Sequence, residues 1–132
     1  MKKFLFIAVL LVSFTSSINA QPQKRGERIE ALKIAYITQA LKLTSEEAQV
    51  FWPVYNTYTS EIKTARQSTK EDELEFQEAV LNIKKKYKAD FKRILKDDVR
   101  VNQVFRAEGD FRTELQKELK KRMQQRQQRQ QQ

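Results

Sequence analysis

Apolar residues recur at intervals of three and four along most of the chain, which is the spacing of an amphipathic helix rather than of a strand. Only two glycines and two prolines are present, so the chain has few of the residues that interrupt helices or form tight turns. The pattern predicts helices at about residues 27–42, 44–66, 70–96 and 98–121. We therefore expect an all-α fold in which four helices form a hairpin arrangement.

The first predicted helix carries more apolar surface than one helix contact normally covers. One stripe along it consists of Ile29, Leu32, Tyr36, Ala40 and Leu43, and a second stripe beside it consists of Ile34, Ile37 and Leu41. A single core would cover the first stripe, so the second needs another partner. That partner is a second copy of the chain or a bound polypeptide, unless both stripes are covered within one protomer.

Two short motifs mark helix starts. In the run from Leu43 to Glu47, the Thr44 hydroxyl is placed to accept a hydrogen bond from the amide of Glu47, while the Glu47 carboxylate accepts one from the amide of Thr44. This reciprocal pattern is a capping box, and it predicts the start of the second helix. Leu95 followed by Asp97 marks the start of the fourth helix in a similar way.

Pro53 falls inside the second predicted helix. Proline lacks an amide hydrogen and crowds the carbonyl of Gln49 one turn earlier, so we expect a kink there rather than the start of a new helix. Trp52 points away from the stripe that holds Phe51 and Tyr55. Trp52 could therefore fill a second interface or contact an exposed apolar client, but packing in the core is the preferred interpretation.

A carboxylate, Glu108, falls inside the apolar stripe of the fourth predicted helix. Such a group needs a partner, and Arg112 lies one turn later at the spacing of a helical ion pair. Gly109 weakens the helix beside it, which indicates close approach of another backbone or ring. We expect Glu108, Phe111 and Arg112 to form a structural clasp rather than a catalytic site.

The two ends of the chain differ in composition from its middle. Residues 1–20 begin with two lysines, continue with a short apolar run and end in a small residue, which is the pattern of a cleavable signal peptide. Residues 21–26 are expected to form a flexible segment before the helical domain at 27–121. Residues 122–132 are rich in Gln and Arg and are expected to be a disordered tail. No second apolar run is long enough to hold the chain in a membrane.

Charge and missing residue types narrow the possible functions. The formal net charge is +9, with 26 basic and 17 acidic residues. For an exported chain this excess favours anionic envelope surfaces and acidic or unfolded polypeptides over nucleic acid as partners. The sequence contains neither His nor Cys, which removes the usual general base, the usual thiol nucleophile and the preferred zinc ligands. We therefore expect no enzymatic activity, no cofactor and no metal site.

The capping run resembles the repeated LTxxQ motif of the Spy/CpxP-like periplasmic proteins. Leu43, Thr44 and Glu47 match its first copy with Glu in place of Gln, whereas Leu95 and Asp97 retain only the Leu and the cap of the second. The Phe-Trp-Pro-x-Tyr run and the pattern Glu108-x-x-Phe111-Arg112 look like a branch often labelled as sensors of extracytoplasmic-function sigma factors. Some members of the wider family bind metals through His and Cys, which this chain lacks.

This resemblance implies a Spy-like arrangement of four helices that forms an antiparallel, cradle-shaped homodimer. It also implies a periplasmic chaperone that works without ATP, or a modulator of envelope stress, with unfolded envelope proteins as partners. The alternative is a structural or adaptor protein that binds the periplasmic domain of a membrane sensor and so regulates a sigma-factor or two-component pathway. The residues expected to face a client or a second protomer are Ile34, Ile37, Leu41, Trp52 and Pro53.

Overall fold

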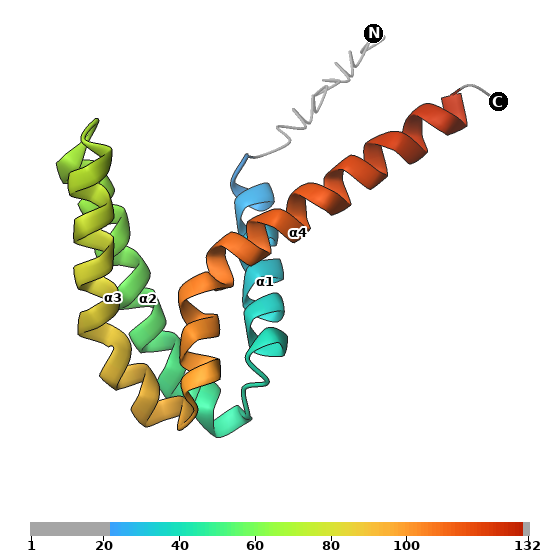
Figure 1. Cartoon of the computed structure of the whole chain (residues 1–132). Helices are drawn as coiled ribbons and strands as arrows, with labels where there is room; N and C mark the ends of the chain where they lie inside the picture. Colours follow the sequence, from blue (N-terminus) through green and yellow to red (C-terminus); the bar gives the residue numbers. More distant parts are fainter. Residues whose placement is uncertain (1–21, 131–132) are drawn as a thin grey trace, which may run out of the picture.

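Four helices make up the chain between residues 22 and 130, the part that this computed structural model describes (Figure 1). They are α1 (Pro22–Ala40), α2 (Ser45–Thr69), α3 (Glu73–Leu95) and α4 (Asp98–Gln130). Residues 22–130 contain no strand. The prediction of an all-α chain with four helices is confirmed, and the predicted signal peptide at residues 1–20 lies outside the described residues.

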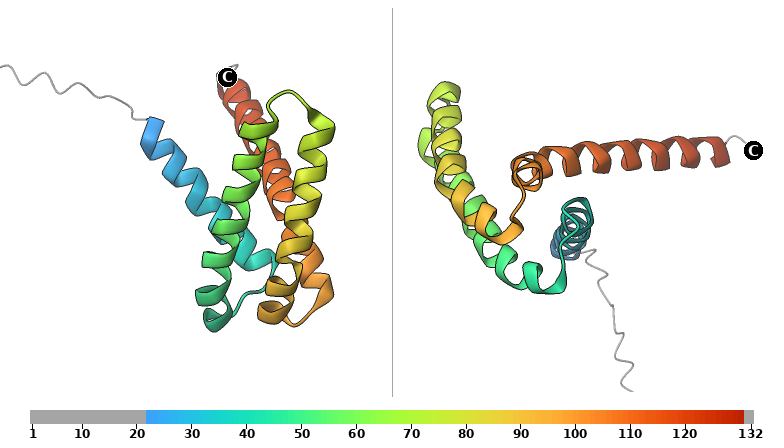
Figure 2. Two further views of the ribbon diagram at one scale, coloured as in Figure 1. Left: turned by 90° about the vertical axis from the view of Figure 1, so that its left-hand side faces the viewer. Right: turned by 60° about the horizontal axis from the view of Figure 1, so that its bottom comes forward.

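The helices form two arms that diverge from one closed end. α2 and α3 pack together as a hairpin, α4 packs against α3, and α1 packs against α4. Figure 1 shows the hairpin in one arm and α1 with the first part of α4 in the other. The α1–α2 and α3–α4 connections lie together at the closed end, and the second part of α4 projects away from the body (Figures 1 and 2). The expected homodimer and Spy-like arrangement remain predictions.

Aromatic rings form much of the core between α2, α3 and α4. Phe91 is fully buried, and its ring centroid lies 5.6 Å from those of Phe51 and Tyr58 and 6.0 Å from that of Phe105. Such tilted and edge-on pairs stabilise beyond simple burial of apolar area. The buried cluster consists of Ile37, Leu41, Phe51, Tyr55, Tyr58, Tyr87, Phe91, Leu95, Val101, Val104 and Ala107.

The predicted helix starts at Thr44 and Asp97 agree with the structure. The Thr44 hydroxyl accepts from the Glu47 amide and the Glu47 carboxylate accepts from the Thr44 amide, both at 3.1 Å, which completes the capping box. The Asp97 carboxylate accepts from the Val99 amide at 2.7 Å at the start of α4. α3 begins at Glu73, three residues later than expected, because Asp72 caps it by accepting from the Glu75 amide.

Lysine occupies the turn positions that glycine normally fills. Lys42, Lys70 and Lys96 have φ values of 49°, 44° and 57°, and each follows the end of a helix. At Lys42 the turn is a Schellman motif, since its amide bonds to the Gln39 carbonyl while the Leu43 amide reaches the Thr38 carbonyl. Positive φ costs a residue with a side chain about 1 kcal/mol or more, but a cation at a helix C-terminus is favoured by the helix dipole.

Both ends of the described chain are more helical than the composition predicted. α1 begins at Pro22, inside the segment expected to be flexible, because proline fits the first position of a helix. α4 continues to Gln130, through most of the expected disordered tail. Gln, Lys and Arg are good helix formers, and Arg122 pairs with Glu118 one turn earlier at 2.9 Å. The tail is therefore an exposed helix up to Gln130.

Pro53 lies in the interior of α2, as predicted, and does not start a new helix. Figure 2, in its right-hand view, shows the α2–α3 hairpin following a curved path around the concave side of the molecule. Trp52 packs against the core, which is the core-packing interpretation preferred from the sequence. Its ring packs edge-on against Phe51 and Tyr55, with centroids 5.2 and 5.5 Å apart, and is only partly exposed.

Candidate binding grooves

The concave side of the molecule carries a cavity of about 700 Å³ between the α2–α3 hairpin and α4. We call it the concave groove. All three helices, which follow one another in the sequence, contribute side chains to it. Its apolar lining consists of Tyr58, Ile62, Phe76, Val80, Val104 and Phe105. These side chains continue the aromatic core outward to the surface, so the groove has an apolar floor.

Positive charge surrounds this floor. Lys63 and Arg66 come from α2, Lys84 from α3 and Arg112 from α4, whereas Glu108 is the only acidic residue of the lining. Arg66 pairs with Glu73 at 2.8 Å and its guanidinium lies 3.4 Å from the Phe76 ring centroid. Within residues 22–130, the other three cations form no ion pair. An apolar floor with free cations around it suits ligands that combine apolar and acidic groups.

The Glu108 carboxylate is paired with other groups than the predicted Arg112. Its carboxylate accepts from the Tyr55 hydroxyl at 3.1 Å and lies 3.5 Å from the Lys33 ammonium. Burial, together with the nearby Glu108 carboxylate, raises the pKa of Tyr58 to about 12. Because Arg112 is exposed and unpaired, the predicted Glu108–Arg112 ion pair is wrong. The carboxylate instead links α1, α2 and α4.

Phe111 of the predicted clasp has a structural contact, whereas the expectation for the neighbouring Gly109 fails. Phe111 is buried against Tyr36 of α1, with ring centroids 5.7 Å apart, so it joins α4 to α1. A Cβ added at Gly109 would meet nothing within 4 Å. Among residues 22–130, no ring or backbone of another element comes that close to this glycine, so the predicted close approach is wrong.

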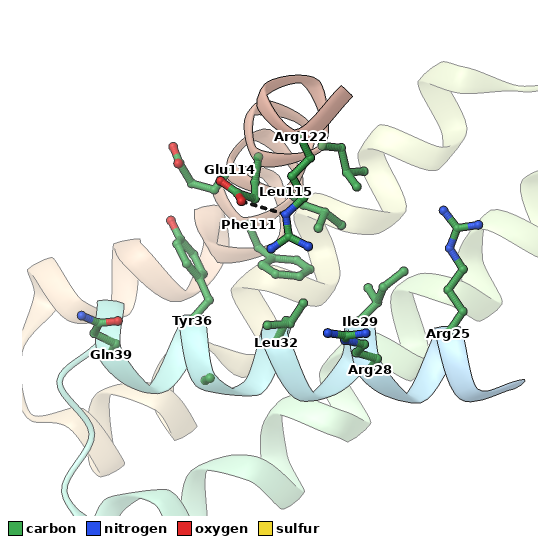
Figure 3. Close-up of a pocket in the computed structure, with 13 residues that line it drawn as sticks. Arg25, Arg28, Ile29, Leu32, Tyr36, Gln39, Phe111, Glu114, Leu115 and Arg122 are labelled. Atoms are coloured by element: carbon green, nitrogen blue, oxygen red, sulfur yellow. Dashed lines mark hydrogen bonds and ion pairs between the residues drawn. The ribbon is translucent and has the colours of Figure 1, made fainter. Parts of the chain in front are cut away.

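A second cavity, of about 470 Å³, lies between α1 and α4 (Figure 3). We call it the α1–α4 slot. Figure 3 shows Ile29, Leu32 and Tyr36 of α1 facing Phe111 and Leu115 of α4 across it. The remaining lining residues are Arg25, Arg28, Ala35, Gln39, Glu114, Glu118, Leu119 and Arg122. Among the apolar lining residues, Ile29 and Leu32 of α1 and Leu119 of α4 remain exposed.

The predicted assignment of the two stripes on α1 is wrong in part. Ile37 and Leu41, expected to face a client or a second protomer, are 0% and 1% exposed and belong to the core. Ile34 is 42% exposed and Pro53 is also exposed, as a surface role requires. Of the stripe expected to enter the core, Ile29, Leu32 and Tyr36 line the α1–α4 slot, while Tyr36 and Leu43 also pack against the core. Periodicity identifies the two faces of a helix, but the position of α4 determines which face is covered.

The sequence analysis did not identify Arg100, which joins the two connections at the closed end. Its guanidinium makes a bidentate pair with Glu47, at 2.8 and 2.6 Å. It also donates to the carbonyls of Leu41, Lys42 and Leu95 at 2.9 to 3.3 Å. Hydrogen bonds from Arg100 hold the pKa of Glu47 at about 2. The sequence feature that points to Arg100 is Glu47. A capping carboxylate has lone pairs left to accept hydrogen bonds from a second donor.

Comparison with protein-family models, curated proteins and solved structures finds no match to this chain. Between residues 22 and 130, no helix combines the length and hydropathy needed to cross a membrane. The same range contains no group of three or more acidic residues arranged to hold a metal ion. The two grooves are therefore the features from which a function can be argued.

Proposed function

We propose that this chain is an exported helical protein that binds partly unfolded polypeptides without ATP, and that the concave groove is its binding surface. The observation that carries the proposal is the combination of an apolar floor with three cations that have no ion-pair partner among residues 22–130. These are Lys63, Lys84 and Arg112, one from each helix around the groove. The proposal places the protein in the periplasm as a non-enzymatic chaperone or modulator of envelope stress, and as an antiparallel homodimer like the proteins that its cap motif resembles.

The proposed mechanism has two steps. The cations attract acidic segments of a client over a distance of about one Debye length, roughly 8–10 Å at ordinary salt. The apolar floor, including Phe76 and Phe105, then retains exposed apolar side chains of the client. Because the hydrophobic contact is not directional, such a groove accepts many sequences. High salt is expected to slow capture while leaving the retained complex less affected.

Light scattering of an aggregating client tests the proposal. The chain without the predicted signal peptide, residues 21–132, should suppress aggregation at an equimolar ratio to the client without ATP. The suppression should be weaker at high salt. The variant Lys63→Glu/Arg112→Glu should lose most of the suppression, since both side chains are exposed and their charge reversal leaves the core intact. Lys85→Glu/Lys88→Glu carries the same change in net charge on exposed positions outside the concave groove. Equal suppression by the two variants would show that the concave groove is not the site.

A further inference from the structure

The α1–α4 slot differs from the concave groove because its charge is concentrated toward one end. Arg25 and Arg28 stand on the part of α1 nearest its N-terminus, while Tyr36 and Gln39 lie at the other end of the lining (Figure 3). About 16 Å of helix separates Arg25 from Tyr36 at 1.5 Å per residue. The apolar side chains lie between these two ends.

The acidic residues of the slot do not cancel the two arginines. Glu114 pairs with Lys117 at 2.7 Å and Glu118 pairs with Arg122 at 2.9 Å, both along α4. Arg25 and Arg28 form no ion pair with any described residue. The N-terminal end of α1 adds partial positive charge from its free amides. An anion at this end of the slot would therefore find two unpaired guanidinium groups.

The middle of the slot is apolar and open. Ile29, Leu32 and Leu119 are 37%, 50% and 45% exposed, which is unusual for large aliphatic side chains that face a cavity together. The volume of about 470 Å³ lies within the usual range of small-molecule sites. An alkyl chain in this position would cover these side chains, and its headgroup would reach the arginines.

We propose that the α1–α4 slot binds a single-chain amphiphile with an anionic headgroup, a carboxylate or a phosphate. The alkyl chain lies between α1 and α4 against Leu32, Leu115 and Leu119, and the headgroup is held by Arg25 and Arg28. This site is separate from the concave groove, so the inference does not rest on the proposed function. Arginine suits both headgroups because its planar fork donates two parallel hydrogen bonds.

Charge makes a second copy of the chain a poor occupant of the slot. A second copy would offer the same face, whose lining carries three arginines, Arg25, Arg28 and Arg122, and two glutamates, Glu114 and Glu118, so it supplies no excess of negative charge to pair with the free guanidinium groups. An acidic amphipathic helix is also a poorer fit, because its carboxylates would be spread along its length while the free cations of the slot are gathered at one end. An amphiphile with one charged end matches this distribution.

The test uses the chain without the predicted signal peptide, residues 21–132. It compares three ligands with the same alkyl chain: dodecanoate, dodecyl phosphate and dodecan-1-ol. Displacement of Nile red, at concentrations below ligand self-association, measures affinity, and calorimetry measures stoichiometry. We expect saturable binding of one ligand per chain, with both anions about tenfold tighter than the alcohol, since a charge-assisted hydrogen bond is worth at least that factor. Equal affinity for the alcohol and the anions would overturn the assignment of the headgroup site.

Two pairs of variants separate the headgroup from the chain. Arg25→Gln/Arg28→Gln should weaken both anions to the affinity of the alcohol and leave the alcohol unchanged, whereas Lys85→Gln/Lys88→Gln should change nothing. Leu32→Asn/Leu119→Asn should weaken all three ligands by about tenfold or more, because an alkyl chain loses its apolar contacts. Leu74→Asn is the matched control, since Leu74 is 78% exposed and lies on α3 away from the slot. Circular dichroism verifies that every variant keeps its helical content.

Three further outcomes would contradict the proposal. If inorganic phosphate bound as tightly as dodecyl phosphate, the slot would bind an anion but not an alkyl chain. Unchanged affinity in the arginine variant would remove the headgroup assignment. A dimer in sedimentation that Leu32→Asn/Leu119→Asn dissociates, with no saturable binding of amphiphile, would show that the slot is an interface between copies. The aggregation assay with Lys63→Glu/Arg112→Glu reports on the concave groove and is independent of all three.

Discussion

The closed end and the α1–α4 slot use the same helices in opposite ways. At the closed end the polar and apolar groups are paired. Arg100 connects Glu47 with three backbone carbonyls, and Leu41 and Leu95 are almost completely buried. In the slot, Ile29 and Leu32 remain partly exposed although the buried Ile37 lies on the same helix, only five residues from Leu32 and eight from Ile29.

This difference separates the parts of the molecule that stabilise the fold from those available to bind. The contacts that stabilise the fold are concentrated at the closed end and along the aromatic hairpin. The arms diverge from there and leave apolar side chains uncovered on α1 and α4. A change at the closed end should therefore alter stability, while the same change in the slot should alter binding alone.

The largest contrast is expected between two residues of α1. Ile37→Ala should lower the free energy of unfolding by about 3 kcal/mol, because it leaves a cavity in a fully buried position. Leu32→Ala, at a position 50% exposed, should cost about 0.5 kcal/mol or less. Urea denaturation followed by circular dichroism measures both. Similar losses for the two variants would mean that the slot is part of the stabilising core.

Arg100→Ala should cost about 2–3 kcal/mol, because the Glu47 carboxylate and three carbonyl groups lose their donor. The matched control is Arg93→Ala. Arg93 is 75% exposed and pairs only with Asp90 on the same helix, so its loss should cost less than about 0.5 kcal/mol. Denaturant midpoints compare the two. A small effect at Arg100 would mean that the closed end is held by apolar packing alone.

Acid should weaken the same contact. The pKa of Glu47 falls from an ordinary value of 4.5 in the unfolded chain to about 2 beside Arg100. The contact therefore contributes fully above about pH 4.5 and is lost as the pH falls from there toward 2. Thermal unfolding of the natural chain and of Arg100→Ala across this window isolates the contribution, because every other carboxylate is common to both. The natural chain should lose its stability advantage toward pH 2, and parallel curves would contradict this.

The smallest predicted effect is an increase in stability. Gly109→Ala should stabilise the protein by about 0.5–1 kcal/mol, since alanine favours a helix interior and a Cβ at this position meets nothing within 4 Å. Gly26→Ala is the comparison, near the start of α1, where helix propensity counts less. A loss of stability or a change of oligomeric state at Gly109 would show that another chain approaches there.

Local features of the fold could be predicted from the sequence because they depend on residues close together in it. The capping box at Thr44, the cap at Asp97 and the position of Pro53 inside α2 involve groups within a few residues of one another. The apolar stripe with Phe91 was also predictable, since its spacing alone assigns it to one helix face. These features were sufficient to establish the all-α class.

The candidate sites depend on residues far apart in the sequence and could be predicted only in part. Arg100 donates hydrogen bonds to Leu41 and Glu47, which lie more than fifty positions away in the sequence. No sequence pattern predicts that Arg100 is the residue that pairs with them. The choice between the two stripes of α1 depends on where α4 crosses. Glu108 was expected to use the partner nearest in sequence, Arg112, but a tyrosine from α2 is closer in space.

The pairing of α1 with α4 has a consequence for the order in which the protein folds. The α2–α3 hairpin brings together neighbours in sequence and can form as soon as both helices have been made. α1 is synthesised before the other three described helices, yet it packs against α4, which follows them all. The apolar side chains of α1 that face α4 therefore remain uncovered until α4 has been synthesised. Docking of α1 onto α4 then completes the native state.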